Sequence, residues 1–407
     1  MSEFDMSGGR GAASDGGLPR FATSADAVAA LAPAEPVYCL YPRLLGEAAQ
    51  AFLQGFPGRT LYAVKANPNP HVLRFLHAAG IRHFDTASLD EIALVKGLFP
   101  DATCYFMAPG KLAGAAQTAF DRYGVRHFVA DHPSELRRLL AIADRDTAII
   151  VRMKAVGPEA VYELSSKFGA DEAQAADMLA EVAASGCRAG LAFNVGSLCR
   201  HPDAYRRAIA AVGRVLESSK AAIEFLDVGG GFPAAYPGLE LPPMTAFFEA
   251  IGEAAADIGL PAGCELMCEP GRALVATGQS LIVQAILIKD DLVFLNDGIY
   301  GGLKELHISD QSVVYPWRVF PGEGAAGGAA HRETRRYLIS GPTCDTLDIL
   351  PFRVELPADL REGDWIEFGM AGAYTNAMST RFNGFAPRHW VALDGPDAAP
   401  PGLYASA

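Results

Sequence analysis

The 407-residue sequence contains no apolar run as long as the roughly 18 residues that a membrane-spanning helix needs. It also lacks a basic N-terminal start followed by an apolar segment. These two absences predict a cytoplasmic protein with no membrane partner. The seven cysteines are odd in number and scattered, without a Cys-x-x-Cys pair. This cysteine pattern indicates a reducing compartment and predicts no structural metal.

Positive charge is also scarce: 34 lysines and arginines face 47 acidic residues, which gives a formal net charge of −13. Because nucleic acids and anionic membranes would be repelled, we expect neither as a partner. A small cationic substrate is compatible with this charge. Half of the residues are hydrophobic and a fifth are charged, the composition of a globular protein with a large core.

The length exceeds that of a usual single core, so two domains are expected. Between residues 60 and 271, about eight short β-prone runs alternate with amphipathic helical patterns. This alternation predicts an α/β fold, a (β/α)8 TIM-like barrel, over residues 43–280. A doubly wound sheet is the alternative, although no Gly-x-Gly-x-x-Gly motif follows a first strand.

The pattern changes near residue 280, where β-prone runs follow one another without helical segments between them. It predicts a C-terminal all-β domain, a barrel or a sandwich, over residues 281–407. The early run at 36–41, PVYCLY, could supply this domain with an N-terminal strand, so residues 21–42 are assigned to it. Residues 1–20 are small, polar and Gly-rich, which predicts a flexible leader. Residues 321–331 are expected to form a mobile loop.

Lys65 follows the apolar run LYAV, at the C-terminal strand end where a barrel places its reactive groups. Its position alone fits a solvated lysine that closes a strand. It also fits an amine held against an apolar wall, with a lowered pKa, that forms a Schiff base. Other residues must decide between these interpretations.

Two further motifs lie at predicted strand ends. Gly229, Gly230 and Gly231 could wrap an anion with their backbone N–H groups, or simply form a tight turn. Glu269 and Arg272, in CEPGR, could bind the ring nitrogen and the phosphate of a cofactor, or could form a plain surface ion pair.

Two loops of the β domain carry the remaining candidates. Cys344 and Asp345, in GPTCD, place a thiol beside a carboxylate, although a free cysteine is more often a small buried hydrophobe. Tyr374 and Phe382 belong to GAYTNAMSTRFNGF.

In their order along the chain, YAVKAN, FDTASLDE, FNVGS, DVGGGF, EPGR, NDGIYGG, GPTCD and GAYT...FNGF resemble the fold type III pyridoxal-phosphate decarboxylases. The resemblance extends from about residue 36 to residue 390, and GPTCD is most similar to the ornithine/lysine branch. It implies pyridoxal 5'-phosphate as the cofactor. It also implies decarboxylation of a basic amino acid to a diamine.

The resemblance further implies roles for single residues. Lys65 would hold the cofactor through a Schiff base, and Glu269 would keep its pyridine nitrogen protonated. The phosphate contacts would come from Ser197, Gly229 to Gly231, Arg272 and Tyr374. Further positions near the cofactor are Asp85, Glu91, Arg152 and Asn194, and Lys167 lies in a lid segment.

In the family that the chain resembles, the active site lies between two subunits of a homodimer, and the GPTCD loop reaches across from the partner. Cys344 would then return a proton to the substrate carbon, and Asp345 would bind a distal substrate ammonium. The other substrate positions implied are Ser309, Asp310 and Phe382.

Two departures from the family pattern concern the substrate. Asn194 replaces the usual histidine that stacks on the cofactor ring, and an amide cannot carry a proton; His201 is too far along the next helix to replace that histidine. Ser309 takes the place of a carboxylate, with Asp310 directly after it.

The substrate therefore stays open among ornithine, lysine, a shorter diamino acid and a modified amino acid. A racemase or a non-catalytic regulator is the alternative function. The regulator is disfavoured because Lys65, Glu269, Arg272, Cys344 and Asp345 are all present.

Overall fold

The computed structural model describes residues 17–155, 160–162, 166–261, 263–309, 311–322 and 333–403. The predicted leader lies outside these ranges up to residue 16, and its last residue, Arg20, belongs to strand β1 (Arg20–Phe21). The predicted mobile loop lies mostly outside the described residues, and so does Asp310.

Eight parallel strands close into a barrel, which confirms the predicted α/β fold and rules out the doubly wound sheet. Each strand is a short run of mostly buried residues, as expected for a parallel sheet covered by helices. The strands are β3 (Arg59–Ala63), β4 (His83–Thr86), β5 (Thr103–Phe106), β6 (His127–Ala130), β7 (Ala148–Arg152), β9 (Arg188–Ala192), β11 (Phe225–Asp227) and β12 (Glu265–Cys268).

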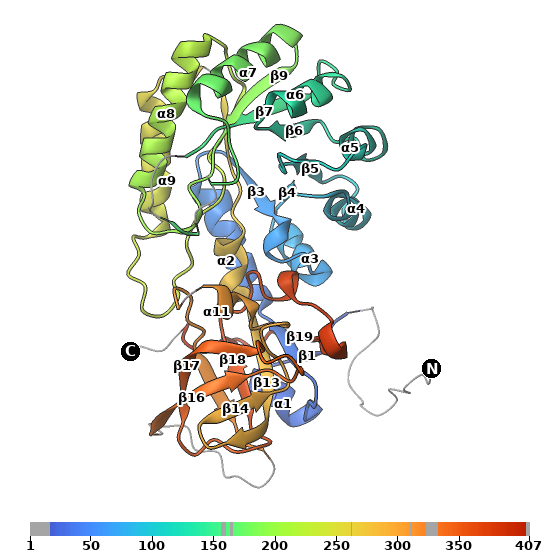
Figure 1. Cartoon of the computed structure of the whole chain (residues 1–407), viewed down its shortest axis with the longest axis vertical. Coiled ribbons are helices and arrows are strands. Elements are labelled where there is room, and N and C mark those ends of the chain that lie inside the picture. The colour runs from blue at the N-terminus through green and yellow to red at the C-terminus, as the bar shows by residue number, and fades with distance from the viewer. Residues whose placement is uncertain are drawn as a thin grey trace.

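Helices cover the outside of this barrel (Figure 1). Their starts follow local capping chemistry: the side chains of Asn69, Ser88 and Asp171 each accept a hydrogen bond from a backbone N–H in the first turn. The helices are α2 (Pro42–Gly55), α3 (Pro70–Ala78), α4 (Leu89–Leu98), α5 (Ala115–Tyr123), α6 (Pro133–Leu140), α7 (Glu172–Ser185), α8 (Asp203–Ser219), α9 (Met244–Asp257) and the short α10 (Arg272–Val275). A small two-stranded antiparallel sheet outside the barrel pairs β8 (Ala160–Tyr162) with β10 (Ser197–Cys199).

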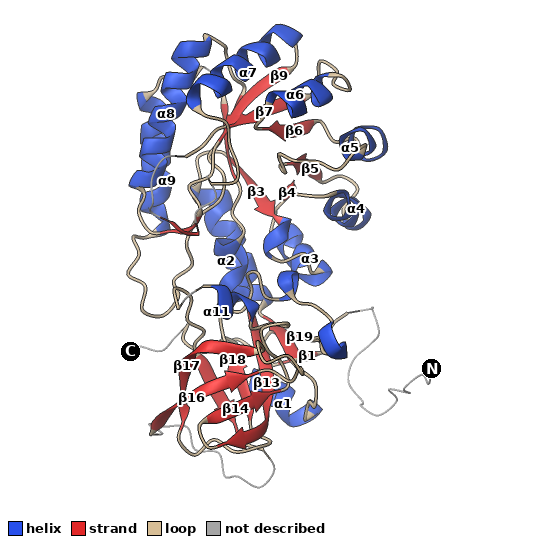
Figure 2. Ribbon diagram, viewed as in Figure 1, coloured by secondary structure: helices blue, strands red, loops and turns tan. Residues whose placement is uncertain are grey.

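The second unit is built on a nine-stranded sheet, whose strands are drawn in red in the lower part of Figure 2. As predicted, it takes an N-terminal strand: β2 pairs with both β13 and β19. Its strands are β1, β2 (Val37–Leu40), β13 (Gln279–Lys289), β14 (Leu292–Leu295), β15 (Trp317–Phe320), β16 (Thr334–Ser340), β17 (Ile349–Pro357), β18 (Trp365–Phe368) and β19 (His389–Leu393). The helices α1 (Ser24–Leu31) and α11 (Lys304–Ile308) accompany these strands in the second unit.

The barrel interior is apolar in the middle and polar at both ends. Its central cluster includes Leu61, Ile150, Phe225 and Met267. Because side chains alternate along a strand, residues two positions further on, such as Asp227, face the interior at the C-terminal mouth. The polar groups that the strands carry to this mouth are therefore held above a rigid apolar layer.

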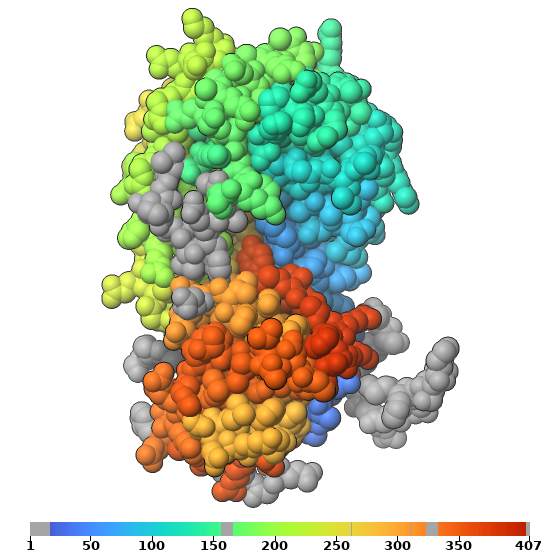
Figure 3. Space-filling view, viewed as in Figure 1, coloured from blue at the N-terminus to red at the C-terminus, as the bar shows by residue number. Residues whose placement is uncertain are grey.

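The two units share one continuous cluster of buried residues, and Figure 3 shows the sheet domain packed against the end of the barrel. No helix within the described residues is long and apolar enough to cross a membrane.

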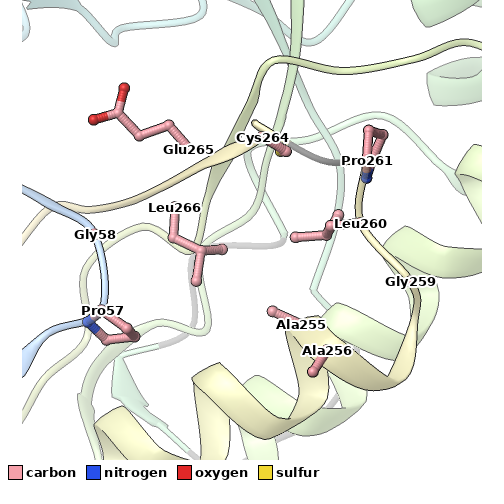
Figure 4. Close-up of a pocket in the computed structure, with 10 residues that line it drawn as sticks. All are labelled: Pro57, Gly58, Ala255, Ala256, Gly259, Leu260, Pro261, Cys264, Glu265 and Leu266. Atoms are coloured by element: carbon pink, nitrogen blue, oxygen red, sulfur yellow. The ribbon is translucent and has the colours of Figure 1, made fainter.

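A hollow of about 410 Å³ lies at the N-terminal end of the barrel, where Gly58 precedes β3. In Figure 4, Leu260 and Leu266 point into this hollow, whereas Glu265 points away. The candidate chemistry gathers at the opposite strand ends.

Candidate active site

Lys65 stands at the C-terminal end of β3, in the 3-10 turn Val64–Ala66. Its ammonium lies 2.6 Å from a carboxylate oxygen of Asp85 at the end of β4, and the lysine side chain is 46% exposed whereas the aspartate is 2% exposed. Burial opposes the charge of Lys65, but the carboxylates of Asp85 and Glu269 outweigh it and raise the pKa of the amine. The expected lowered pKa is therefore wrong, because a charged partner and not an apolar wall faces the amine.

Lys65 lines a small cavity at this mouth together with most of the cofactor-binding residues proposed from the sequence. Tyr374 reaches the cavity from the sheet domain. Its backbone N–H donates to the carbonyl of Ala66, in the turn after β3, at 2.8 Å. The predicted residues around the cavity are Lys65, Asn194, Ser197, Gly230, Gly231, Glu269, Arg272 and Tyr374.

The triple-glycine turn after β11 forms one wall of this cavity. Gly229 and Gly231 have φ of +68° and +102°, which L side chains rarely adopt. A Cβ on Gly229 would lie 2.2 Å from the carbonyl oxygen of Phe193, and one on Gly230 would lie 2.8 Å from that of Glu269. Glycine is required here for close backbone approach, as in an anion-binding cradle. The residues therefore fit a phosphate group.

Arg272 begins α10 and is held firmly beside this turn. Its guanidinium donates to Glu305 at 2.6 Å and to the hydroxyl of Tyr236 at 3.0 Å, and it lies 3.4 Å from the hydroxyl oxygen of Ser197. Burial opposes its charge, but Tyr236, Glu305 and Tyr374 together raise the pKa of Arg272. A permanent cation therefore lines the same cavity as the glycine turn, as phosphate binding requires.

Glu269 follows β12 directly and is 8% exposed. Burial and the neighbouring carboxylates of Asp85 and Asp227 raise the pKa of Glu269 well above its ordinary range. A positively charged ring nitrogen at this position would favour the ionised form of Glu269. The buried acid therefore fits the role of a partner for a pyridinium nitrogen.

Three further predicted residues lie around this centre. Asn194 turns its side-chain oxygen to the backbone N–H of Gly196, 2.9 Å away, and so holds the loop after β9. Arg152 ends β7 with its guanidinium 5.0 Å from the ring centre of Phe168. The carboxylate of Glu91 accepts from the backbone N–H of Ala87 at 2.6 Å.

Cys344, Asp345 and Phe382 form a second cluster with Tyr300, apart from the residues that line the cavity. Tyr300 donates to Asp345 at 2.5 Å, and its ring centre lies 4.9 Å from that of Phe382. The bonds from the N–H of Leu347 and from Tyr300 lower the pKa of Asp345. Cys344 is exposed, so this cluster presents a thiol and a carboxylate at the surface.

The remaining predicted positions do not line the cavity. Ser309 is buried, and its hydroxyl donates to the carbonyl of Leu306 at 3.1 Å, so its substrate contact stays a prediction. His201 is exposed ahead of α8, and Lys167 is exposed with its ammonium 4.9 Å from the ring centre of Phe168. The site of Asp310 lies outside the described residues.

Three polar residues around the site were missed in the sequence: Asp227, Tyr236 and Glu305. Asp227 belongs to the quoted motif DVGGGF, so its place at a strand end was a usable signal. Glu305 and Tyr236 reach Arg272 only through tertiary packing. Their sequence positions gave no such signal.

A closed β/α barrel that presents a lysine, a buried acid and an anion-binding turn at one mouth fits the class of enzymes that use pyridoxal phosphate. Residues 43–276 match the family described as pyridoxal-dependent decarboxylase, pyridoxal binding domain. The chain belongs to this family, and its cofactor is pyridoxal phosphate.

Three relatives illustrate the similarity. The lysine/ornithine decarboxylase of Selenomonas ruminantium is 32% identical over 334 residues, which cover 80% of each chain. The structure of a Paramecium bursaria Chlorella virus arginine decarboxylase bound to agmatine has a TM-score of 0.79 and 27% identity, and the match covers 90% of this chain and 98% of that one. The lysine/ornithine decarboxylase of Vibrio vulnificus complexed with cadaverine has a TM-score of 0.76 and 30% identity, with 90% and 96% covered.

Proposed function

We propose that this protein decarboxylates a basic amino acid, ornithine or lysine, to the corresponding diamine within polyamine biosynthesis. The observation that carries the proposal is the cavity in which the Lys65 ammonium, the buried Glu269 and the Arg272 guanidinium meet the triple-glycine turn. The names of the relatives support a basic amino-acid substrate.

Pyridoxal phosphate, when bound, supplies an aldehyde for amines and a ring that accepts the electron pair released as carbon dioxide leaves. Lys65 must lose a proton before it can act as a nucleophile, and Asp85 is the base within 2.6 Å. Glu269 would hold the ring nitrogen. Arg272, Ser197, Tyr374 and the N–H groups of the glycine turn would hold the phosphate.

We also infer a homodimer with shared active sites. The exposed Cys344 and the half-buried Asp345 lie on a loop that does not line the cavity of their own chain. A second subunit would bring them to that cavity, where Cys344 would donate a proton to the substrate carbon. Asp345, ionised at neutral pH because its pKa is lowered, would bind the distal ammonium of the substrate together with Phe382.

A second candidate function is decarboxylation or racemisation of a shorter or modified amino acid. It is favoured by Ser309, which replaces an acid and whose hydroxyl is already bonded to Leu306. A site with one carboxylate fewer holds a distal ammonium less firmly. The two candidate functions therefore differ in the distal end of the substrate.

The test begins with the purified protein loaded with pyridoxal phosphate and reduced with borohydride. Peptide mass spectrometry is expected to find the cofactor on Lys65, and Lys65→Ala should lose both the adduct and turnover. Carbon dioxide release is then measured for L- and D-ornithine, lysine, arginine and 2,4-diaminobutyrate. Release from 2,4-diaminobutyrate but not from ornithine or lysine would favour the second candidate, and so would release from none of them with the adduct present. An active Lys65→Ala variant would reject the site itself.

A further inference from the structure

Asp227 and Glu269 form a pair of buried carboxyl groups at the barrel mouth. The proposed function gives a role to Glu269 and none to Asp227. Asp227 ends β11, and Glu269 follows the end of the neighbouring parallel strand β12. Asp227 is completely buried and Glu269 is 8% exposed. Neither acid can rely on water to stabilise a negative charge.

The backbone ties these two acids to the triple-glycine turn. Asp227 Oδ1 accepts from the N–H of Gly229 at 2.8 Å, and the carbonyl of Gly229 accepts from the N–H of Glu269, also at 2.8 Å. The other oxygen, Asp227 Oδ2, is buried and has no hydrogen-bond partner among the described residues as long as both acids are ionised. A protonated Glu269 side chain would supply the donor. A buried oxygen without a partner is costly unless it carries or receives a proton.

The charged groups around the pair favour retention of one proton. Burial raises the pKa of Asp227 to about 7; Asp85 adds to this rise, whereas the N–H of Gly229, a hydrogen bond with the side chain of Glu269 and the nearby Arg152 oppose it. Burial and the same Asp85 also raise the pKa of Glu269, whereas the positive charges of Lys65 and Arg152 lower it. Tyr105 faces Asp227 from β5, and its own pKa is raised to about 12. Two adjacent buried carboxylates rarely ionise together at neutral pH.

We propose that Asp227 and Glu269 share one proton, which Glu269 carries in the cofactor-free chain. When Glu269 faces the cofactor ring, Asp227 carries this proton and donates a hydrogen bond to the ionised carboxylate of Glu269. Asp227 is then a positioning residue: it keeps Glu269 ionised and aimed while its other oxygen holds the glycine turn. This inference rests on the proposed function of Glu269 as the partner of the ring nitrogen.

Two substitutions at position 227 separate this role from simple packing. Asp227→Asn keeps an oxygen for the N–H of Gly229 and supplies an amide N–H to Glu269, so it imitates the protonated acid. Asp227→Leu fills a similar volume and can do neither. The dissociation constant of pyridoxal phosphate is measured by absorbance for each variant. Asp227→Asn should stay within about threefold of the wild type, and Asp227→Leu should bind at least about tenfold more weakly.

The proton itself is located by infrared spectroscopy of the cofactor-loaded protein. The wild type minus Asp227→Asn difference spectrum should contain a carboxylic-acid band that moves when all aspartates are labelled with ¹³C and stays when glutamates are labelled. Asp257→Asn, which removes an exposed carboxylate at the end of α9, is the control and should keep the band.

Three results would overturn the proposal: no carboxylic-acid band, a band that follows the glutamate label, or equal weakening by Asn and Leu at position 227. Failure of the proposed function is recognised separately, because wild-type protein would then give no borohydride adduct at Lys65.

Discussion

At the scale of single residues, the raised pKa of Asp227 links stability to pH in a definite direction. An aspartate with a folded-state pKa of about 7 binds its proton more tightly in the folded chain than in the unfolded chain. Its contribution to stability is complete at pH below about 4, the pKa of an unfolded aspartate, and is lost as the pH rises toward 7.

Asp227→Asn should remove this loss. The melting temperatures of the two proteins without added cofactor, compared between pH 5 and pH 8, should therefore diverge in favour of the variant as the pH rises. The difference is expected to be on the order of 1 kcal/mol per pH unit inside that window. Parallel pH curves for the variant and the wild type would contradict the raised pKa.

Gly229 tests the close backbone approach in the glycine turn. Gly229→Ala would place a methyl group 2.2 Å from the carbonyl of Phe193 at a positive φ, whereas Gly238→Ala, also at a positive φ, meets nothing within 4 Å. The control should lose about 1–2 kcal/mol of unfolding free energy from backbone strain alone. Gly229→Ala should lose about 1–3 kcal/mol more from the clash, and should also bind pyridoxal phosphate more weakly. Urea unfolding of both variants checks the difference, and equal losses would show that the turn can relax.

The buried pair of Arg272 and Glu305 provides a further residue-level test. Both side chains are almost fully buried, so Glu305→Ala removes the carboxylate that balances a buried positive charge and should cost about 3–5 kcal/mol. The exposed pair of Arg214 and Glu172 is the control, and Glu172→Ala should cost at most about 1 kcal/mol. The double variant Arg272→Met/Glu305→Leu should regain most of the lost stability without cofactor binding. Failure to regain it would mean that other contacts of these residues dominate.

At the scale of elements, the strands and helices that could be predicted are those marked by a pattern of neighbouring residues in the sequence. All eight barrel strands are short apolar runs that end in a polar or Gly-rich turn, and that pattern is visible without tertiary contacts. Strand β17 was missed because Pro351 interrupts its pattern, and proline argues against a strand interior. Helix α11, five residues long, is too short to show a helical period.

The same distinction holds for the candidate site. Lys65, Gly229 to Gly231, Glu269 and Arg272 stand at strand ends, so the barrel topology alone brings them to one mouth. The ion pair between Lys65 and Asp85 depends on the side-chain directions of two neighbouring strands, and the expected lowered pKa failed for that reason. Glu305 reaches Arg272 from another domain, which no local pattern encodes.

The loop at 341–348 allows a prediction about substrate recognition. Asp345→Ala should raise KM for ornithine or lysine by about tenfold or more, because a hydrogen bond between charged groups is lost. Tyr300→Phe removes only the hydroxyl that donates to Asp345 and should raise KM less. Steady-state carbon dioxide release measures both variants. An unchanged KM in Asp345→Ala would indicate a substrate without a distal ammonium.

At the scale of the whole molecule, one chain holds two separate sets of chemical groups. The cavity at the barrel mouth contains Lys65, Glu269 and Arg272, whereas Cys344 and Asp345 belong to a separate cluster on the sheet domain. Exposed Leu347, Phe382 and Phe385 lie on the loops of that cluster or close to it. Apolar side chains gathered around exposed polar groups are typical of a surface that another protein covers. A symmetric dimer would then complete two sites at once.

Complementation between two inactive variants tests this arrangement. Lys65→Ala and Cys344→Ala should each be nearly inactive as pure proteins, because every site lacks one group. When the two are co-expressed, half of the dimers combine one chain of each kind, and each mixed dimer contains one site with both groups intact. Activity should return to about a quarter of the wild-type value.

The double variant Lys65→Ala/Cys344→Ala is the matched control: co-expressed with an equal amount of wild type, it inactivates both sites of every mixed dimer. Only the wild-type dimers then remain active, again about a quarter of all dimers. If each chain contained its own complete site, the first mixture would stay inactive and the second would keep about half of the wild-type activity.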